Sequence, residues 1–247
     1  MSDAVGISSA SAQSKRTLQP QAQGLFITGT DTDVGKTEVT LGLMAALQRC
    51  GLSLLGMKPV AAGCVLTAEG LRNEDALRIQ AQGSTLLAYS AINPYAFEPP
   101  IAPHIAAAQL GVEMQIEPIK TAYQQLAAQA DWVVVEGAGG WRVPLGPGLT
   151  LADLASALDL PVVLVVGLRL GCLNHALLSA ESIQASGLRL AGWVANRIDP
   201  TMAAVDENLT TLREWLAAPC LGVIPWLPAP TPAQIADQLV VAELLRA

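Results

Sequence analysis

The amino-acid sequence predicts an α/β fold with a doubly wound, mostly parallel sheet and helices on both faces. Three apolar runs, at 132–135, 162–166 and 190–195, lack the polar alternation of a half-exposed strand. Such runs suit strands that are covered on both faces, as in parallel sheets. Segments able to form helices separate them, and a strand, a loop and a helix follow one another from residue 24. We therefore expect strands joined by crossover helices.

Elements in the first half of the chain are marked by apolar spacing and by punctuating residues. In chain order we expect a strand at 24–29, a helix at 35–50, a strand at 53–57, an irregular loop at 58–67 and a helix at 71–82. The first helix carries Val39, Leu43 and Leu47 at helical spacing. The second is expected to begin with the polar cluster at 72–75.

The middle and the end of the chain are less regular. Residues 93–103 hold four of the sixteen prolines and cannot form a regular element, although 101–110 can restart a helix. The elements expected elsewhere are a helix at 116–130, the three apolar strands, a helix at 201–217, a strand at 221–224, a proline-rich bend and a terminal helix.

Length and composition favour one domain. A chain of 247 residues lies within the range of single α/β domains. Half of the residues are hydrophobic but only 4% are aromatic, so Ala, Leu and Val must fill the interior. We expect residues 1–22, which are rich in Ser, Ala and Gln, to form a disordered tail, and residues 23–247 to form a single domain.

Charge and cysteine content bound the partners. A net charge of −7 and a pI near 4.8 disfavour nucleic acid and anionic membranes, which bind clustered Lys and Arg. No run is apolar enough for a secretory signal or a membrane span. The four cysteines have neither the spacing of a zinc site nor the density of a disulfide scaffold. We expect a cytoplasmic protein.

The segment 29–37, Gly-Thr-Asp-Thr-Asp-Val-Gly-Lys-Thr, joins the first expected strand to the first helix. Backbone N–H groups of such a loop, with the helix N-terminus, cradle phosphates. Lys36 would reach the β- and γ-phosphates, and Thr37 would bind magnesium. Five residues rather than four separate Gly29 from Gly35, so the loop is a variant of the standard motif. The sequence thus predicts a P-loop NTPase-like protein that binds ATP with Mg²⁺.

Carboxylates near this loop are candidate ligands for the metal, because Mg²⁺ takes one or two carboxylates with phosphate oxygens and water. Glu136 follows an apolar run and precedes four small residues, Gly-Ala-Gly-Gly, a placement that suits the crevice at the strand ends. Its alternative is a solvated glutamate at a strand end. Asp75 could instead cap its helix. Asp31 and Asp33 could either fix the loop or contact the ion.

Several further segments occur in a characteristic order with the phosphate loop. They are 58–60, 72–75, 93–95, 103–104, 136–140, 171–175 and 192–196. With these segments the chain resembles dethiobiotin synthetase from about residue 25 to residue 227. Outside the phosphate loop no single segment is diagnostic, but their joint order and spacing are specific.

The resemblance implies ATP-dependent closure of a cyclic urea. One amine of 7,8-diaminononanoate captures CO₂ as a carbamate, and ATP phosphorylates the carbamate oxygen. The second amine then attacks the mixed carbamic-phosphoric anhydride, which gives dethiobiotin, ADP and phosphate. The resemblance also implies a homodimer whose active site lies at the interface.

The resemblance further implies roles for individual residues. Catalysis is assigned to Lys36 and Lys58, and the metal to Thr37, Asp75 and Glu136. Nucleotide contacts are assigned to Asp33, Val34, Gly35, Lys36, Thr37, Glu38, Asn196, Arg197, Pro225, Trp226 and Leu227. Substrate contacts are assigned to Thr32, Lys58, Ala62, Gly139, Gly171, Cys172 and Asn174.

Some of these assignments have competing interpretations. Lys58 could be a surface lysine at a strand end, Trp226 could pack in the core, and Cys172 could be a packing residue. Ala62 stands where members of the family commonly carry Ser, so the backbone N–H groups of residues 61–63 would have to replace a side-chain hydrogen bond.

Two other functions share the phosphate loop. A ParA-like nucleotide switch would carry a signature lysine early in the loop, and residues 30–34 contain none. A cobyrinate-type amide synthetase would need an ammonia source, often an attached glutaminase domain, and no such domain fits after residue 227.

Overall fold

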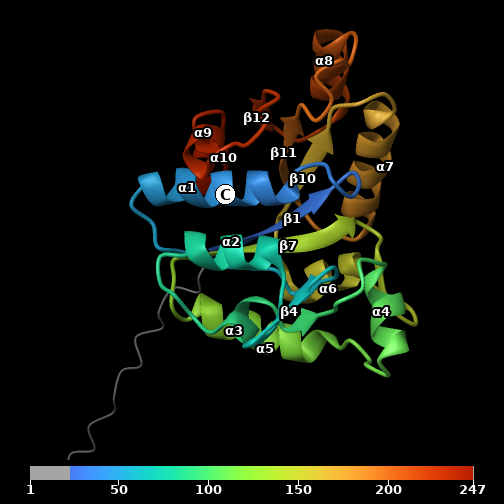
Figure 1. The fold of residues 1–247 in the computed structure, drawn as a ribbon. Coiled ribbons are helices and arrows are strands. Elements are labelled where there is room, and N and C mark those ends of the chain that lie inside the picture. The colour runs from blue at the N-terminus through green and yellow to red at the C-terminus, as the bar shows by residue number, and fades with distance from the viewer. Residues whose placement is uncertain (1–22, 247) are drawn as a thin grey trace, which may run out of the picture.

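The computed structural model describes residues 23–246, so the expected tail at 1–22 lies outside the described residues. Six parallel strands form its main sheet, in the order β12-β11-β10-β1-β7-β2 (Figure 1). Their bounds are β1 Gln23–Gly29, β2 Leu54–Met57, β7 Trp132–Gly140, β10 Val162–Gly167, β11 Leu190–Asn196 and β12 Cys220–Ile224. The predicted fold class is confirmed.

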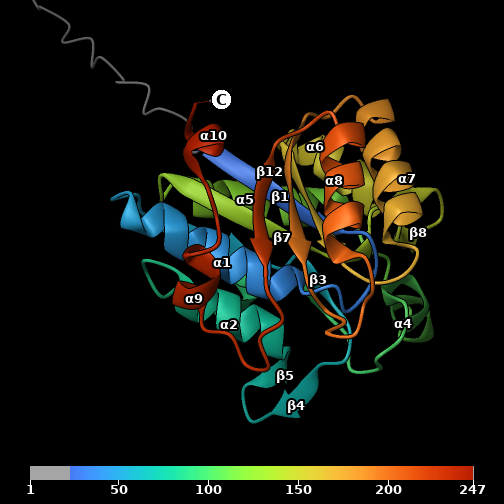
Figure 2. The same ribbon diagram turned by 90° about the horizontal axis from the view of Figure 1, so that it is seen from above.

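Helices cover both faces of this sheet. Its main helices are α1 Lys36–Arg49, α2 Glu74–Gln82, α5 Ile116–Ala127, α6 Leu151–Leu158, α7 Cys172–Ala185 and α8 Val205–Trp215. Figures 1 and 2 show α1 and α2 on the side of the sheet opposite α5 and α6. Apolar side chains fill most positions of the sheet strands, and Phe26 and Trp193 are fully buried among them. Among the described residues no helix is long and apolar enough to cross a membrane.

Short pairings correct the expectation of an irregular loop at 58–67. The two-residue strand β3 Val60–Ala61 pairs with β6 Tyr95–Ala96, and β4 Val65–Thr67 forms a hairpin with β5 Gly70–Arg72. The hairpin also shows that the predicted start of the next helix, at residue 71, is too early. Because residues 70–72 pair as a strand, α2 begins only at Glu74, where the Oδ1 of Asn73 accepts the N–H of Ala76 at 3.1 Å and caps the helix.

The chain after β11 also departs from expectation at its helix ends. Helix α8 begins at Val205 rather than at 201, because the carboxylate of Asp199 accepts the N–H and hydroxyl of Thr201 in a turn. The expected terminal helix is two short ones, α9 Pro232–Ala236 and α10 Ala242–Leu245. The remaining short elements are α3 Tyr89–Ile92, α4 Pro103–Gln109, β8 Pro144–Gly146 and β9 Leu149–Thr150.

The parallel strands bring distant segments to one edge. The loop between β1 and α1, the residue after β2, the end of β11 and the turn after β12 all lie at the carboxyl ends of strands. Ligands of doubly wound sheets collect at this edge. The predicted phosphate loop and most of the predicted site residues therefore fall on one side of the molecule.

Candidate active site

The phosphate loop wraps tightly around the start of α1. Asp33 and Gly35 both adopt left-handed backbone conformations, with φ of 58° and 83°. A Cβ at Gly35 would lie 2.1 Å from the side-chain amide nitrogen of Asn196. Both the left-handed backbone and this close contact therefore require glycine at the position. The Nζ of Lys36 donates to the main-chain carbonyl of Asp31 at 2.8 Å, which folds the lysine back over the loop.

Lys36 is almost fully buried. Desolvation lowers its pKa to about 8, and the nearby charges of Glu136 and Asp33 only partly offset that effect. A buried lysine beside a phosphate-binding loop is paired best by an anion, and a phosphate group supplies one.

A cavity of about 840 Å³ opens in front of the loop. Both polar and apolar residues line it. Its polar lining is Thr32, Asp33, Lys36, Thr37, Glu38, Lys58, Asn73, Asp75, Arg78 and Glu136. Its apolar and backbone lining includes Ala61, Ala62, Pro100, Ile101, Pro103, Ala138, Gly139 and Val143.

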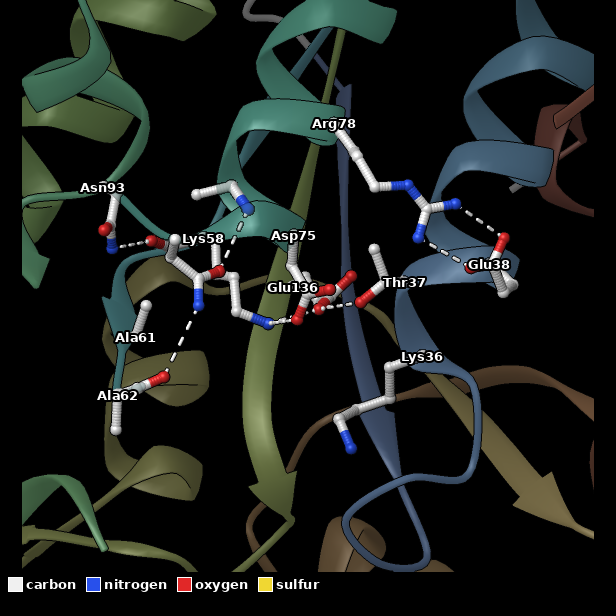
Figure 3. A network of polar contacts seen from close by, with 12 residues as sticks. Lys36, Thr37, Glu38, Lys58, Ala61, Ala62, Asp75, Arg78, Asn93 and Glu136 are labelled. Carbon is white, nitrogen blue, oxygen red and sulfur yellow. Dashed lines mark hydrogen bonds and ion pairs between the residues drawn. The ribbon is translucent and has the colours of Figure 1, made fainter. Parts of the chain in front are cut away.

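Four predicted site residues that line the cavity are joined by hydrogen bonds (Figure 3). The Nζ of Lys58 donates to Glu136 Oε1 at 2.6 Å and to Asp75 Oδ2 at 3.0 Å. The hydroxyl of Thr37 donates to the same Glu136 oxygen at 2.9 Å. Lys58 is 6% exposed and Glu136 is fully buried, so the interpretations of a surface lysine and a solvated glutamate are both wrong.

Burial and charge oppose one another in this cluster. Burial alone would lower the pKa of Lys58, but Glu136 and Asp75 outweigh it and raise that pKa. Burial likewise favours neutral Asp75, yet the charge and hydrogen bond of Lys58 lower its pKa overall. The pair is therefore ionic at neutral pH.

The donor set at this point fits a magnesium ion. The Oε2 atom of Glu136 is buried and has no hydrogen-bond partner, a costly arrangement unless a cation or another donor reaches it. Beside it lie the Asp75 carboxylate and the Thr37 hydroxyl, the hard oxygens that Mg²⁺ prefers. No group of three or more His, Cys, Asp or Glu that could hold a metal occurs in residues 23–246. Two carboxylates suit an ion that takes its other ligands from phosphate and water.

A second ion pair also lines the cavity. Both terminal guanidinium nitrogens of Arg78, on α2, donate to the carboxylate of Glu38, on α1, at 2.7 and 2.8 Å. This bidentate pair ties the helix that carries Thr37 to the helix that carries Asp75. Sequence reasoning missed Arg78, although its spacing of three from Asp75 put both on one helix face.

A smaller cavity of about 330 Å³ adjoins the first beyond Glu38. The predicted base-binding residues Asn196, Arg197, Pro225, Trp226 and Leu227 all line it. Trp226 is 47% exposed, so the expectation that it could pack in the core is wrong. The amide nitrogen of Asn196 also donates to the carbonyl of Val34 at 3.0 Å, which joins this cavity to the phosphate loop.

Three predicted substrate residues lie apart from these cavities. Gly171, Cys172 and Asn174 stand at the N-terminus of α7 and line neither cavity. Cys172 is 2% exposed, as its packing interpretation requires, whereas Asn174 is exposed. An ion pair between Arg169, in the loop before α7, and Asp31 joins this helix end to the phosphate loop. Asp31 also accepts the N–H of Thr32 at 2.7 Å, so it fixes the loop.

Known proteins resemble this chain in sequence. Residues 23–234 match a family model described as an AAA domain. A curated protein of Pseudomonas aeruginosa, ATP-dependent dethiobiotin synthetase BioD, is 57% identical over 87% of this chain and 94% of its own length. A relative of the same name from Xanthomonas oryzae is 54% identical, over 85% of this chain and 93% of its length.

Solved structures share the fold at lower identity. The MinD cell division protein of Aquifex aeolicus is 16% identical, with a TM-score of 0.53 over 89% of each chain. In its MinC:MinD complex the identity is 18% and the TM-score 0.54, over 89% of this chain and 88% of that one.

Proposed function

The chain belongs to the dethiobiotin synthetase family and is an ATP-dependent ligase of biotin biosynthesis, and from that premise we propose that it closes a cyclic urea from 7,8-diaminononanoate and CO₂. The observation that carries the proposal is the meeting of Lys58, Asp75 and Glu136 beside the phosphate loop in one cavity. A reaction that activates a carboxylated amine with ATP needs such a meeting of cationic and metal-binding groups.

Nucleotide binding would use both cavities. The triphosphate would lie along the backbone N–H groups of residues 32–37 at the N-terminus of α1, with Lys36 against its terminal phosphate. The base would enter the smaller cavity between Asn196 and Trp226. Glu38 lines both cavities, so a ligand that spans them must pass it.

Magnesium would be held by Thr37, Asp75 and Glu136, and when bound it neutralises charge on the phosphates during transfer. The unpartnered Glu136 Oε2 and the two neighbouring oxygens support that assignment.

Lys58 would hold the carbamate. An ammonium group has three donors, and Asp75 and Glu136 accept from it here, so one N–H can still point to a carbamate oxygen. That oxygen attacks the terminal phosphorus of ATP, and the P–O bond to ADP breaks. The charge of Lys58 would stabilise the resulting mixed anhydride.

Ring closure follows from the second amine. Its nitrogen forms a bond to the carbamate carbon and gives up a proton to the leaving phosphate or to solvent. The C–O bond to phosphate breaks, so phosphate leaves with one oxygen that came from CO₂. The apolar lining residues Pro100, Ile101 and Val143 would suit the alkyl chain of the substrate. The backbone N–H of Ala62, which lines the cavity, would replace the hydroxyl that its side chain lacks, because the N–H of Gly63 donates to the carbonyl of Pro99 at 3.2 Å.

The protein would act as a cytoplasmic homodimer. Gly171, Cys172 and Asn174 lie outside the cavity of their own chain, so they could reach substrate only across an interface. The N-terminus of α7 would then bind the substrate carboxylate of the other subunit. Free thiols at all four cysteines accord with a reducing compartment.

Substrate-dependent phosphate release tests the proposed reaction. With MgATP present, bicarbonate together with diaminononanoate should stimulate release, and either alone should not. Ammonia with a corrinoid acid should give no stimulation. Stimulation by the second pair but not the first would assign the chain to amide synthesis instead.

A further inference from the structure

We infer that the hydroxyl of Tyr89 is a positioning group that fixes Lys58 relative to Asp75. This inference rests on the proposed function, because it concerns the two residues that would hold carbamate and metal. Tyr89 lines neither cavity and would touch no substrate. It acts through a closed set of hydrogen bonds that begins at the backbone of Lys58 and returns to its side chain.

The first part of this ring holds the backbone of Lys58. The amide nitrogen of Asn93 donates to the carbonyl of Lys58 at 2.7 Å (Figure 3). The N–H of Lys58 in turn donates to the carbonyl of Ile92 at 2.9 Å. Asn93 is only 3% exposed, so its contacts are shielded from water. The segment that ends α3 thus fixes the residue that follows β2.

The second part holds the start of α2. The N–H of Asn73 donates to the Tyr89 hydroxyl at 2.8 Å, and that hydroxyl donates to Asn93 Oδ1 at 2.9 Å. Asn73 is the N-cap of α2 and is 8% exposed. Asp75 is the second residue of that helix, so its position follows from the cap.

The ring closes between the two functional side chains. Asp75 accepts from the Nζ of Lys58 at 3.0 Å. The Tyr89 hydroxyl is the point where the segment of Lys58 and the segment of Asp75 are joined. The guanidinium of Arg72 lies 4.4 Å from the centre of the Tyr89 ring and holds it in place.

The two hydrogen bonds of Tyr89 require a protonated hydroxyl. This group must accept from Asn73 and donate to Asn93 at the same time, which an ether-like or ionised oxygen cannot do. Burial raises the pKa of Tyr89, which keeps the proton in place. Phenylalanine would keep the ring and the cation–π contact but leave both buried partners unpaired.

The test compares Tyr89→Phe with Tyr123→Phe. Tyr123 is a matched control, because its hydroxyl lies beside Gly24 at the amino end of the sheet, far along β1 from the site. We expect Tyr89→Phe to lower kcat by about tenfold or more while the KM for ATP stays within about twofold, because misplacement of reacting groups affects the transition state more than ground-state binding. Tyr123→Phe should keep kcat within about twofold.

A double-mutant cycle separates positioning from general stability. In an Asp75→Asn background, the hydroxyl has lost the carboxylate that it positions, so Tyr89→Phe should cost much less in kcat than it does alone. Strictly additive losses in kcat, or a Tyr89→Phe variant as active as the wild type, would overturn the inference.

Amide hydrogen exchange gives a readout that needs no turnover. The N–H of Asn73 should exchange several-fold faster in Tyr89→Phe, with no change at β10, if the hydroxyl is its partner. Unchanged exchange at Asn73 would refute the closed set of hydrogen bonds itself. A wild type that forms no cyclic product would instead refute the proposed function and leave the exchange result to decide the ring.

Discussion

The ammonium of Lys58 lies 2.6 Å from Oε1 of Glu136, and both side chains are buried at the carboxyl edge of the sheet. Removing either partner of such a pair leaves an uncompensated charge in a region of low dielectric. The pair therefore links the stability of the apo protein to the same residues that would serve the reaction.

Lys58→Ala should separate turnover from nucleotide binding. We expect kcat to fall by about 100-fold, since the cation proposed to stabilise the anhydride is gone. The affinity for MgATP, measured by calorimetry, should change little. The apo variant should also lose about 3 kcal/mol of stability, because Glu136 is left unpaired. Lys120→Ala on α5 is the control, and near-normal turnover of Lys58→Ala would remove this lysine from the mechanism.

Glu136→Gln should weaken the use of magnesium. The substitution keeps the shape of the side chain but removes the charge at the buried, unpartnered oxygen. We expect the Mg²⁺ concentration for half-maximal activity to rise at least about tenfold. Glu207→Gln on α8 should behave as the wild type. A magnesium titration identical in both variants would contradict the assignment.

MgATP binding should take up a proton near pH 8.5. Burial lowers the pKa of Lys36 from 10.5 to about 8, so much of it is neutral at that pH. A phosphate beside it stabilises the charged form and raises its pKa, so the proton is bound with the nucleotide. Calorimetry in buffers with different ionisation enthalpies measures this uptake. Lys36→Arg, which stays protonated, should abolish it.

The same shift fixes the pH dependence of apo stability. Between pH 8 and pH 10.5 the unfolded chain holds the Lys36 proton and the folded protein does not. The contribution of Lys36 to the free energy of unfolding therefore rises with pH in that window. Comparison of Lys36→Met with the wild type at pH 7.5 and 9.5 checks the sign, and a stability difference that is independent of pH would exclude it.

Gly42→Ala should loosen the smaller cavity. An added Cβ would lie 2.2 Å from Cγ2 of Ile235, a residue of α9 that lines this cavity. Displacement of α9 should raise the KM for ATP by about tenfold, at an overpacking cost of about 1–3 kcal/mol. Adding Ile235→Ala removes the clashing carbon and should restore part of the stability. Gly146→Ala, where an added Cβ meets nothing within 4 Å, is the control.

Leu170→Asp should separate the subunits if the N-terminus of α7 lies at an interface. Leu170 is 97% exposed, which is unusual for a large apolar side chain. We expect sedimentation to show a monomer with much lower turnover. Leu86→Asp, at a side chain that is 77% exposed beyond α2, should leave the assembly intact. A Leu170→Asp protein that sediments as a dimer would place the interface elsewhere.

The sheet was largely predictable because short apolar runs of the sequence mark its strands. The runs at 132–135, 162–166 and 190–195 each lie within an observed strand. The phosphate loop was equally local. The beginning of α2 was not, since residues 70–72 pair with β4 and only that pairing removes them from the helix.

Much of the site depends on contacts that no local pattern encodes. Lys58 and Glu136 are 78 positions apart, and only the neighbouring places of β2 and β7 in the sheet bring them together. The same holds for Arg78 with Glu38, which join two helices. Sequence could name Glu136 from its place after an apolar run and Lys58 through resemblance, but their burial and shared hydrogen bonds required the fold.

The most direct test of the central claim follows oxygen from CO₂. The enzyme is mixed rapidly with doubly ¹⁸O-labelled CO₂, diaminononanoate and MgATP, before the label exchanges with water, and the products are examined by mass spectrometry. Transfer of phosphate to a carbamate oxygen predicts one labelled oxygen in the cyclic urea and one in the released phosphate. Phosphate without label, beside a labelled urea, would contradict the anhydride and the role given to this site.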